Sequence, residues 1–423
     1  MSRRAVITGI GVVAPSGTTA SEHWQTVLAG ENRIAPITHF DASEYSTTLA
    51  GEVRDFAPEQ HLDRRLIVQT DRWTWLSLAA TAQALADAAL DPAELDPYRM
   101  SVALASSSGG NHFGQRELQR LWSGAGRTVG AYQSIAWFYA ASVGQTSILH
   151  QMKGPSSVLV SEAAGGLDSL GHAIRAIRRG VDVVVAGGTE APLGPYALAC
   201  LQRNGWLSRR TDPARGYLPF DADAAGYLPA EGGAIFVVEE EQHALRRGAP
   251  YMYAELAGYA ATHDGRTCRP RGDSNGEQPS KYLAAALERA LHRAHTTPER
   301  TDVLFADAVG VPTADRAEAE AIRTVFPGGV PVTGHKGLLG RAAHGSSALD
   351  VATAVLAMRE QTLPAFGALT DPAPGCELDF IAAPRRAPVH VAAVAARGYD
   401  GFNSALILRR PEGTRSRPEG TRK

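Results

Sequence analysis

The sequence predicts an α/β protein whose strands are buried on both faces. Short apolar runs rich in β-branched residues, bounded by glycines, alternate with segments of helical periodicity along the chain. Continuous apolar runs, unlike alternating ones, are typical of strands covered on both faces. The chain has 423 residues, 44% apolar and 20% charged, which is enough for one large core or two closely packed halves.

Seven apolar runs are predicted as strands. They are residues 5–8, 156–160, 183–186, 235–238, 303–306, 391–394 and 404–408. A helix is predicted over 167–177, directly after the second run. Its apolar residues recur at helical spacing: Leu167, Leu170, Ile174 and Ile177.

The chain divides into two halves and a tail. A second strand-rich part begins near residue 250, so we predict one half over 1–250 and another over 251–410. The segment 263–280 is polar and rich in glycine and proline, which predicts an exposed loop, and its Arg-Gly-Asp triplet is a chance match. Residues 411–423 repeat Pro-Glu-Gly-Thr-Arg and are predicted to be disordered.

Composition excludes several classes of function. A net charge of −2 provides no basic field for nucleic acid or anionic lipid. No stretch reaches the roughly 20 apolar residues that span a bilayer, and the N-terminus reads as a strand rather than a signal peptide. The cysteines, Cys200, Cys268 and Cys376, lack the spacing of a zinc site or disulfide framework. We therefore expect a reduced, cytoplasmic protein. Only four of the 42 basic residues are lysine, a bias that resembles proteins of high-GC actinobacteria.

Two motifs suggest cofactors that the context does not support. Residues 9–14 match the G-x-G-x-x-A dinucleotide fingerprint, but Pro15, Ser16 and Gly17 follow where that fingerprint needs a helix. His172 lies inside the predicted helix with no second ligand at metal spacing. We expect neither a cofactor nor a metal.

A degenerate nucleophile elbow lies at residues 158–172. This segment reads as a strand, a sharp turn of small residues and a helix, an arrangement that normally presents a nucleophile at a helix N-terminus. The turn carries Ala163, Ala164, Gly165 and Gly166. Because alanine can neither attack a thioester nor exchange a proton, the elbow is predicted to be inactive.

The residues around this elbow resemble the β-ketoacyl synthase family, over residues 3 to about 410. The similar segments are Gly154-Pro155-Ser156-Ser157, Gly166-Leu167-Asp168, Pro219-Phe220-Asp221 with Glu231-Gly232-Gly233, Ala306 to Gly310 with Asp315 and Glu318, Lys336 to Gly340, and Arg397 to Asn403. The resemblance implies a thiolase-like five-layer αβαβα fold made of two pseudo-repeated halves. It places Ala163 at the family's cysteine.

The resemblance also locates the family's two catalytic histidines. Decarboxylative condensation needs a thiolate and two imidazoles. This chain has Val309 and Arg341 at the histidine positions and retains Lys336. His344 belongs to a different helical face and is not expected to replace either histidine.

The replacements are similar to the chain-length factor, or ketosynthase beta subunit, of aromatic type II polyketide synthases. Similar segments are Glu162 before Ala163, Gly310-Val311-Pro312 with Asp315 to Glu320, and Gly340-Arg341. The resemblance implies a non-catalytic subunit that forms a heterodimer with a ketosynthase alpha subunit. That partner uses phosphopantetheinyl acyl carrier protein substrates. Many members have glutamine at the position of Ala163, so alanine argues against a decarboxylating, priming role here.

The resemblance places a channel-gating helix at residues 109–118. Its gating positions are Asn111, Gly114 and Leu118, which share one helical face. Small residues there imply a roomy channel and a product of decaketide length or longer. Close helix packing is the alternative explanation of Gly114. Four aromatic residues are candidates for the subunit interface: Phe113, Tyr132, Trp137 and Phe138.

Two other functions remain open at this stage. One is a malonyl decarboxylase or divergent condensing enzyme of the same fold, using Lys336, His344 or a displaced cysteine. The other is a structural subunit that stabilises its partner without measuring chain length.

Overall fold

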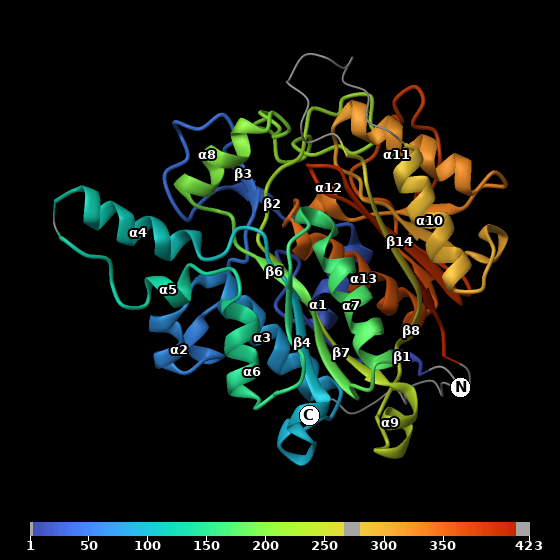
Figure 1. Ribbon diagram of the computed structural model, residues 1–423. Helices are drawn as coiled ribbons and strands as arrows, with labels where there is room; N and C mark the ends of the chain where they lie inside the picture. The colour runs from blue at the N-terminus through green and yellow to red at the C-terminus, as the bar shows by residue number, and fades with distance from the viewer. Residues whose placement is uncertain (1–2, 125, 266–279, 412–423) are drawn as a thin grey trace.

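The computed structural model describes residues 3–124, 126–265 and 280–411 (Figure 1). Its strands are β1 (Ala5–Val13), β2 (Ile34–Pro36), β3 (Leu49–Gly51), β4 (Met100–Ala105), β5 (Ser157–Leu159), β6 (Val183–Glu190), β7 (Gly232–Glu240), β8 (Ala254–His263), β9 (Val303–Phe305), β10 (Pro331–Thr333), β11 (Thr362–Leu363), β12 (Asp379–Phe380), β13 (Arg385–Arg386), β14 (Val391–Arg397) and β15 (Phe402–Arg409). Its helices are α1 (Ala20–Ala29), α2 (Arg64–Gln69), α3 (Arg72–Asp87), α4 (Asn111–Trp122), α5 (Gln133–Ala136), α6 (Ala141–Leu149), α7 (Gly165–Arg178), α8 (Pro195–Arg203), α9 (Glu241–Arg246), α10 (Lys281–Arg293), α11 (Pro312–Val325), α12 (Lys336–Leu339) and α13 (His344–Glu360).

Eleven strands form one mixed sheet with a repeated topology. Their order is β12-β10-β9-β14-β15-β8-β1-β7-β6-β4-β5. The run β5-β4-β6-β7-β1 and the run β10-β9-β14-β15-β8 have the same order when the strands are numbered along each half of the chain. The two runs join where β1 pairs with β8. This repeat confirms the predicted fold of two pseudo-repeated halves, while the exact boundary at residue 250 stays a prediction.

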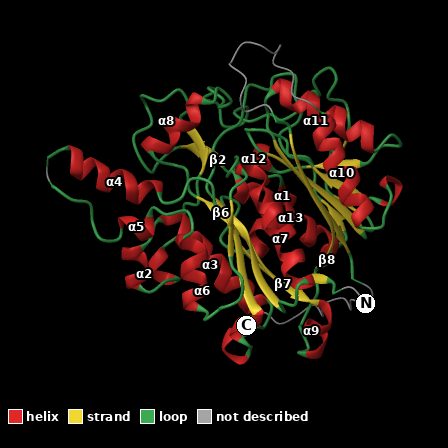
Figure 2. Ribbon diagram, viewed as in Figure 1, coloured by secondary structure: helices red, strands yellow, loops and turns green. Residues whose placement is uncertain are grey.

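The helices and the two runs of strands form five layers. Helices α7 and α13 contact each other and strands of both halves, so they form the central layer (Figures 1 and 2). Helices α3 and α6 cover the outer face of the first run of strands, and α10 covers the outer face of the second. The central helix α13 is buried along nearly its whole length. The predicted α/β architecture is confirmed.

The predicted strands and the predicted helix are all present, with one difference in burial. Strand β5 is the last strand of the sheet and pairs only with β4 among the described strands. Its three residues are half-buried, and Val160 beyond it is 55% exposed. An apolar run therefore forms an open edge of the sheet rather than an interior strand.

The dinucleotide-like glycines lie inside β1 and serve packing. A Cβ on Gly9 would lie 2.1 Å from the carbonyl oxygen of Ala84, and one on Gly11 would lie 1.8 Å from that of Ala80. Both carbonyls belong to α3, which packs directly on β1. The motif thus allows close contact between helix and strand, a role that the sequence analysis did not predict.

Several predictions fall on residues outside the described ranges. These are Cys268, the Arg-Gly-Asp triplet at 271–273, most of the 263–280 loop and the tail from residue 412 onward. Among the helices described, none is long and apolar enough to cross a membrane.

Candidate functional site: a degenerate condensing site

The predicted elbow lies between β5 and α7, in the central layer. Residues Glu162–Ala164 form a single 3-10 turn that continues into α7 at Gly165. Glu162 has a φ of 48°, a left-handed conformation that is uncommon outside glycine and frequent at functional turns. Ala163 is 1% exposed, and its carbonyl oxygen accepts a hydrogen bond of 2.6 Å from Ser347 Oγ. The turn therefore has the shape of a nucleophile elbow without a reactive side chain.

The small residues after Ala163 are required by close contacts with α13. A Cβ on Gly166 would lie 2.5 Å from Ser347 Oγ and 2.6 Å from the carbonyl oxygen of His344. Real Cβ atoms do not approach other atoms so closely, so a side chain here would push α7 away from α13. The glycines thus preserve the fold of the elbow independently of chemistry.

Val309 lies on the loop that follows β9 and is buried. Two acidic side chains of α11 hold this loop. Glu318 accepts hydrogen bonds from the backbone N–H groups of Asp307 and Ala308, at 2.6 and 2.9 Å. Asp315 accepts one from the N–H of Gly310 at 2.9 Å. The two side chains of α11 therefore fix the backbone of the loop that carries the Val309 isopropyl group.

Arg341, at the other position that the resemblance assigns to a histidine, forms a buried ion pair. Its Nη2 lies 3.1 Å from Oδ2 of Asp307 and donates to the carbonyl oxygen of Arg397 at 2.6 Å. Burial disfavours the charged guanidinium, but the carboxylates of Asp307 and Glu162 outweigh that effect and raise the pKa of Arg341. A group that is always protonated cannot act as a general base.

These contacts bring the three degenerate positions into one buried region. Asp307, the partner of Arg341, is two residues before Val309 in the same loop. Glu162, which acts on the charge of Arg341, is next to Ala163. This region therefore contains methyl, isopropyl and guanidinium groups, none of which can act as the thiolate or the imidazoles that condensation needs.

Lys336 is in a separate ion pair. Its side chain is 1% exposed, and its Nζ contacts the carboxylate of Asp350 and donates to the carbonyl oxygen of Ala306 at 3.1 Å. Burial raises the pKa of Asp350 to about 6, although Lys336 opposes that effect. Lys336 thus ties α12 to α13, which is a structural role.

His344 lies closer to the elbow than its helical position suggested. It is fully buried, and a Cβ on Gly165 would lie 3.0 Å from the Cβ of His344. Its Nε2 is 3.0 Å from the carbonyl oxygen of Thr189, while Nδ1 faces Glu190 Oε2 at 3.4 Å and Ser107 Oγ at 3.3 Å. Both ring nitrogens have polar neighbours, so His344 offers no free nitrogen toward the elbow.

The predicted gating positions lie on α4, which projects from the body of the protein together with α5 (Figure 1). Asn111 and Gly114 are buried, whereas Leu118 is 45% exposed. A Cβ on Gly114 would lie 2.6 Å from Cδ1 of Trp137. The indole therefore rests directly on Gly114, which gives the close-packing explanation of this glycine a specific partner.

The same projection carries most of the large apolar side chains on the surface. Among the residues that the structure describes, eight of the fifteen exposed large hydrophobic residues lie between residues 118 and 139: Leu118, Trp122, Val129, Tyr132, Ile135, Trp137, Phe138 and Tyr139. We call these eight residues the α4–α5 patch. Phe113 is half-buried and is not one of the eight residues. The guanidinium of Arg116 lies over the Phe113 ring, 5.7 Å from the centroid of that ring.

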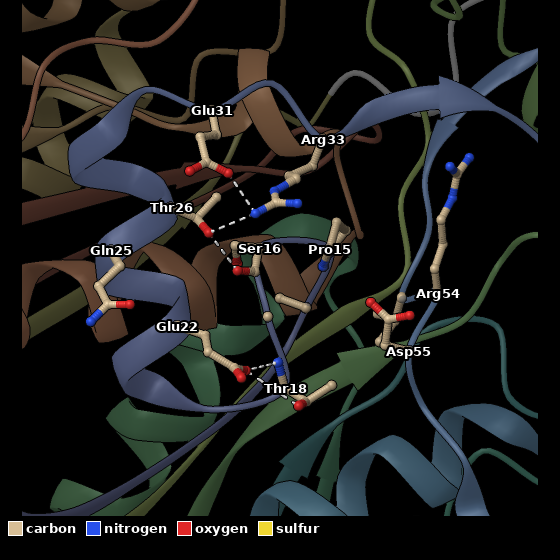
Figure 3. A pocket seen from close by; sticks show the side chains of 13 residues that line it. Pro15, Ser16, Thr18, Glu22, Gln25, Thr26, Glu31, Arg33, Arg54 and Asp55 are labelled. Atoms are coloured by element: carbon tan, nitrogen blue, oxygen red, sulfur yellow. Dashed lines mark hydrogen bonds and ion pairs between the residues drawn. The ribbon is translucent and has the colours of Figure 1, made fainter.

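A polar cavity of about 320 Å³ lies elsewhere, around the loop between β1 and α1 (Figure 3). Its charged side chains mostly have partners: Arg33 pairs with Glu31, and Glu22 accepts a hydrogen bond from the N–H of Thr18. None of the degenerate positions lines it. Within the described ranges, no group of three or more His, Cys, Asp or Glu side chains is placed to hold a metal. His172 is half-buried on α7.

Comparison with known proteins agrees with this geometry. Residues 2–244 match the family model "Beta-ketoacyl synthase, N-terminal domain", and residues 253–370 match "Beta-ketoacyl synthase, C-terminal domain". The chain belongs to the β-ketoacyl synthase family. It is 34% identical over 418 residues to a 3-oxoacyl-[acyl-carrier-protein] synthase 2 of Coxiella burnetii, covering 96% of this chain and 99% of that one.

More similar relatives define the branch. The ketoacyl synthase beta subunit of the tetracenomycin polyketide synthase of Streptomyces glaucescens is 48% identical over 410 residues, covering 96% of this chain and 98% of the relative. The putative β-ketoacyl synthase 2 of actinorhodin biosynthesis in Streptomyces coelicolor is 46% identical over 409 residues, with coverages of 96% and 98%. Within the family, the chain is thus one of the ketosynthase beta subunits, or chain-length factors, of type II polyketide synthases.

Solved structures show the same architecture. The ishigamide ketosynthase/chain length factor superposes with a TM-score of 0.88 at 26% identity, covering 97% of this chain and 100% of that one. A type II acyl-carrier protein in complex with its ketosynthase contains a chain that superposes with a TM-score of 0.87 at 25% identity, with the same coverages. The thiolase-like fold implied by the resemblance is therefore confirmed.

Sequence reasoning missed the groups that surround the degenerate positions. The partners Asp307 and Asp350 were not singled out for those roles, and neither was Tyr217, a fully buried residue whose hydroxyl donates to the carbonyl oxygen of Ala308 at 2.8 Å. The sequence did contain a signal for the Arg341 ion pair. One segment that resembles the family carries a basic residue at a buried position, and a second such segment carries an acidic residue.

Proposed function

We propose that this protein is the non-catalytic chain-length factor of a minimal type II polyketide synthase. The observation that carries the proposal is the buried pair of Arg341 and Asp307. The resemblance assigns Arg341 to a catalytic histidine position and the buried Ala163 to the cysteine position. The condensing chemistry then belongs to a ketosynthase alpha subunit, which uses malonyl units carried by a phosphopantetheinyl acyl carrier protein in the cytoplasm.

Two surface features support association with that subunit. The α4–α5 patch gathers eight exposed large apolar side chains, five of them aromatic, within one projection, and such clusters typically mark interfaces. Nearby in the fold, the open edge of β5 leaves backbone hydrogen-bonding groups available, and Ile148, Leu149 and Val160 expose further apolar surface. Together these features suit a large, apolar interface with one partner.

Co-purification of the two subunits tests this association. Trp122→Asp with Phe138→Asp places charges in the patch, at side chains that are 82% and 45% exposed in the free chain. We expect the variant to fold but to lose its ketosynthase. Leu245→Asp is the matched control, because Leu245 is 53% exposed but lies on α9. Retention of the ketosynthase by the double variant would contradict this interface.

The proposed role in chain length depends on α4. Asn111, Gly114 and Leu118 are one or two turns apart on one face of this helix, which begins beside the patch. We infer that this face closes the far end of a channel at the subunit interface. Further extension would then overpack a closely packed interior, which is energetically costly. Because the gate carries no aromatic side chain, we propose a product of decaketide length or longer.

A further inference from the structure

A second pocket, away from the degenerate site and the patch, is lined by three arginines. It measures about 390 Å³ and lies between α7 and the neighbouring α10 and β8 (Figure 1). Arg175 and Arg178 come from the last turn of α7, and Arg293 is the last residue of α10. The other lining residues are Gly171, Ile174, Gly258 and Tyr259.

Tyr259 positions two of these arginines. Arg293 Nη1 donates to the carbonyl oxygen of Tyr259 at 2.6 Å, and the Arg175 guanidinium lies 5.8 Å from the centroid of the Tyr259 ring. The Tyr259 hydroxyl is itself held by Asp168, to which it donates at 2.7 Å. The floor of the pocket is thus anchored to α7 and β8.

The arginines of the pocket have no acidic ion-pair partner among the described residues. Within residues 3–124, 126–265 and 280–411, none of the three arginines forms an ion pair with an acidic side chain. The pKa of His172, one turn before Arg175, is lowered by burial and further by Arg175 and Arg179. A positively charged arginine at a helix C-terminus interacts favourably with the helix dipole. That effect does not explain why arginines of two helices meet in one pocket.

We propose that this pocket binds a phosphate-bearing anion of the diphosphate class. A guanidinium carries five N–H donors in a planar fork that matches phosphate oxygens, and Arg293 uses a donor on only one of its nitrogens for Tyr259. Three positive charges exceed what one carboxylate neutralises, whereas a diphosphate supplies several charges and acceptors. The pocket is also large enough for more than a single phosphate group.

Calorimetric titration with inorganic pyrophosphate tests the proposal on the full chain, co-purified with its ketosynthase. We expect saturable binding with a Kd of about 1 mM or tighter, weakened by added salt. Arg178→Gln and Arg293→Gln should each weaken binding by about threefold to tenfold, since each removes a charge-assisted contact. Arg179→Gln is the matched control. It removes the same charge from the next residue, which does not line the pocket, and should leave binding unchanged.

A parallel titration with coenzyme A identifies the source of the diphosphate. Tighter binding of coenzyme A than of pyrophosphate, lost in Arg178→Gln, means that the pocket takes a nucleotide. Equal affinity means that it takes a free diphosphate. The proposal is overturned if neither probe binds saturably, or if Arg179→Gln weakens binding as much as the two pocket variants. All three variants alter exposed side chains, so an unchanged melting temperature verifies that they fold.

Discussion

The guanidinium of Arg341 and the carboxylate of Asp307 form a buried ion pair, with Nη2 and Oδ2 3.1 Å apart, at the position that the resemblance assigns to a catalytic histidine. Their side chains are 4% and 1% exposed. A carboxylate in this environment needs a permanent counter-charge, which arginine provides. The pair is therefore part of the protein's internal structure.

Removal of one partner from this pair should destabilise the protein strongly. Arg341→Met leaves the Asp307 carboxylate buried without its counter-charge, so the free energy of unfolding should fall by about 3–5 kcal/mol. Urea denaturation measures the change. Arg210→Met is the control, because Arg210 pairs with Asp223 at the surface, where such pairs contribute about 0–1 kcal/mol. Equal effects of the two substitutions would contradict the importance of the buried pair.

The buried Asp315, which holds the loop that carries Val309, should make the free energy of unfolding depend on pH. Burial raises the pKa of Asp315 from 3.8 to about 8, and the charge of Glu318 adds to this effect. Because the folded-state pKa is above the unfolded one, the contribution of Asp315 to stability is complete below about pH 4. It is lost as the pH rises through 8.

Asp315→Asn imitates the protonated form and should flatten this dependence. Between pH 5 and 9, the free energy of unfolding should fall further in the native protein than in the variant. The difference between the two falls should exceed about 1.4 kcal/mol, which is the free energy of one pKa unit. Urea unfolding across this range gives both slopes. Glu320→Gln changes an exposed acid of the same helix and should keep the native slope. Identical slopes in the native protein and Asp315→Asn would contradict the assignment.

A larger side chain at a gating position should shorten the polyketide. Leu118→Phe adds volume at a gating position without touching Gly114, so the product of the co-expressed pair should lose one or more two-carbon units by mass spectrometry. Gln119→Phe is the matched control, because it places the same side chain on another, exposed face of α4. Shortening by both variants, or by neither, would contradict the gate.

Gly114→Thr separates the two explanations of that glycine. A larger side chain there must displace the Trp137 indole, which is 53% exposed and has room to move. If Gly114 serves only packing, the variant changes tryptophan fluorescence and stability while product length stays the same. If it belongs to the gate, the product also becomes shorter.

The sequence predicted the architecture, because the architecture depends on local signals, whereas the assignment of Val309 and Arg341 to histidine positions follows from the family resemblance and stays a prediction. Apolar runs and glycine-bounded helices are visible within a few residues, and so is the alanine at the elbow. Long-range contacts are not. The partnership of Asp307 with Arg341 spans 34 residues, and the contact of Trp137 with Gly114 depends on the path between α4 and α5. The edge position of β5 follows from sheet order, which no single apolar run specifies.

Malonyl-carrier-protein consumption, with the mass of any product, tests the central claim most directly. It is measured for the protein alone, for its Ala163→Cys variant and for the pair with its ketosynthase. We expect neither single-chain sample to condense malonyl units, because Val309 and Arg341 still replace both imidazoles, and we expect the pair to make long polyketides. Condensation by the isolated native chain would show that another residue performs the chemistry and would contradict a non-catalytic role.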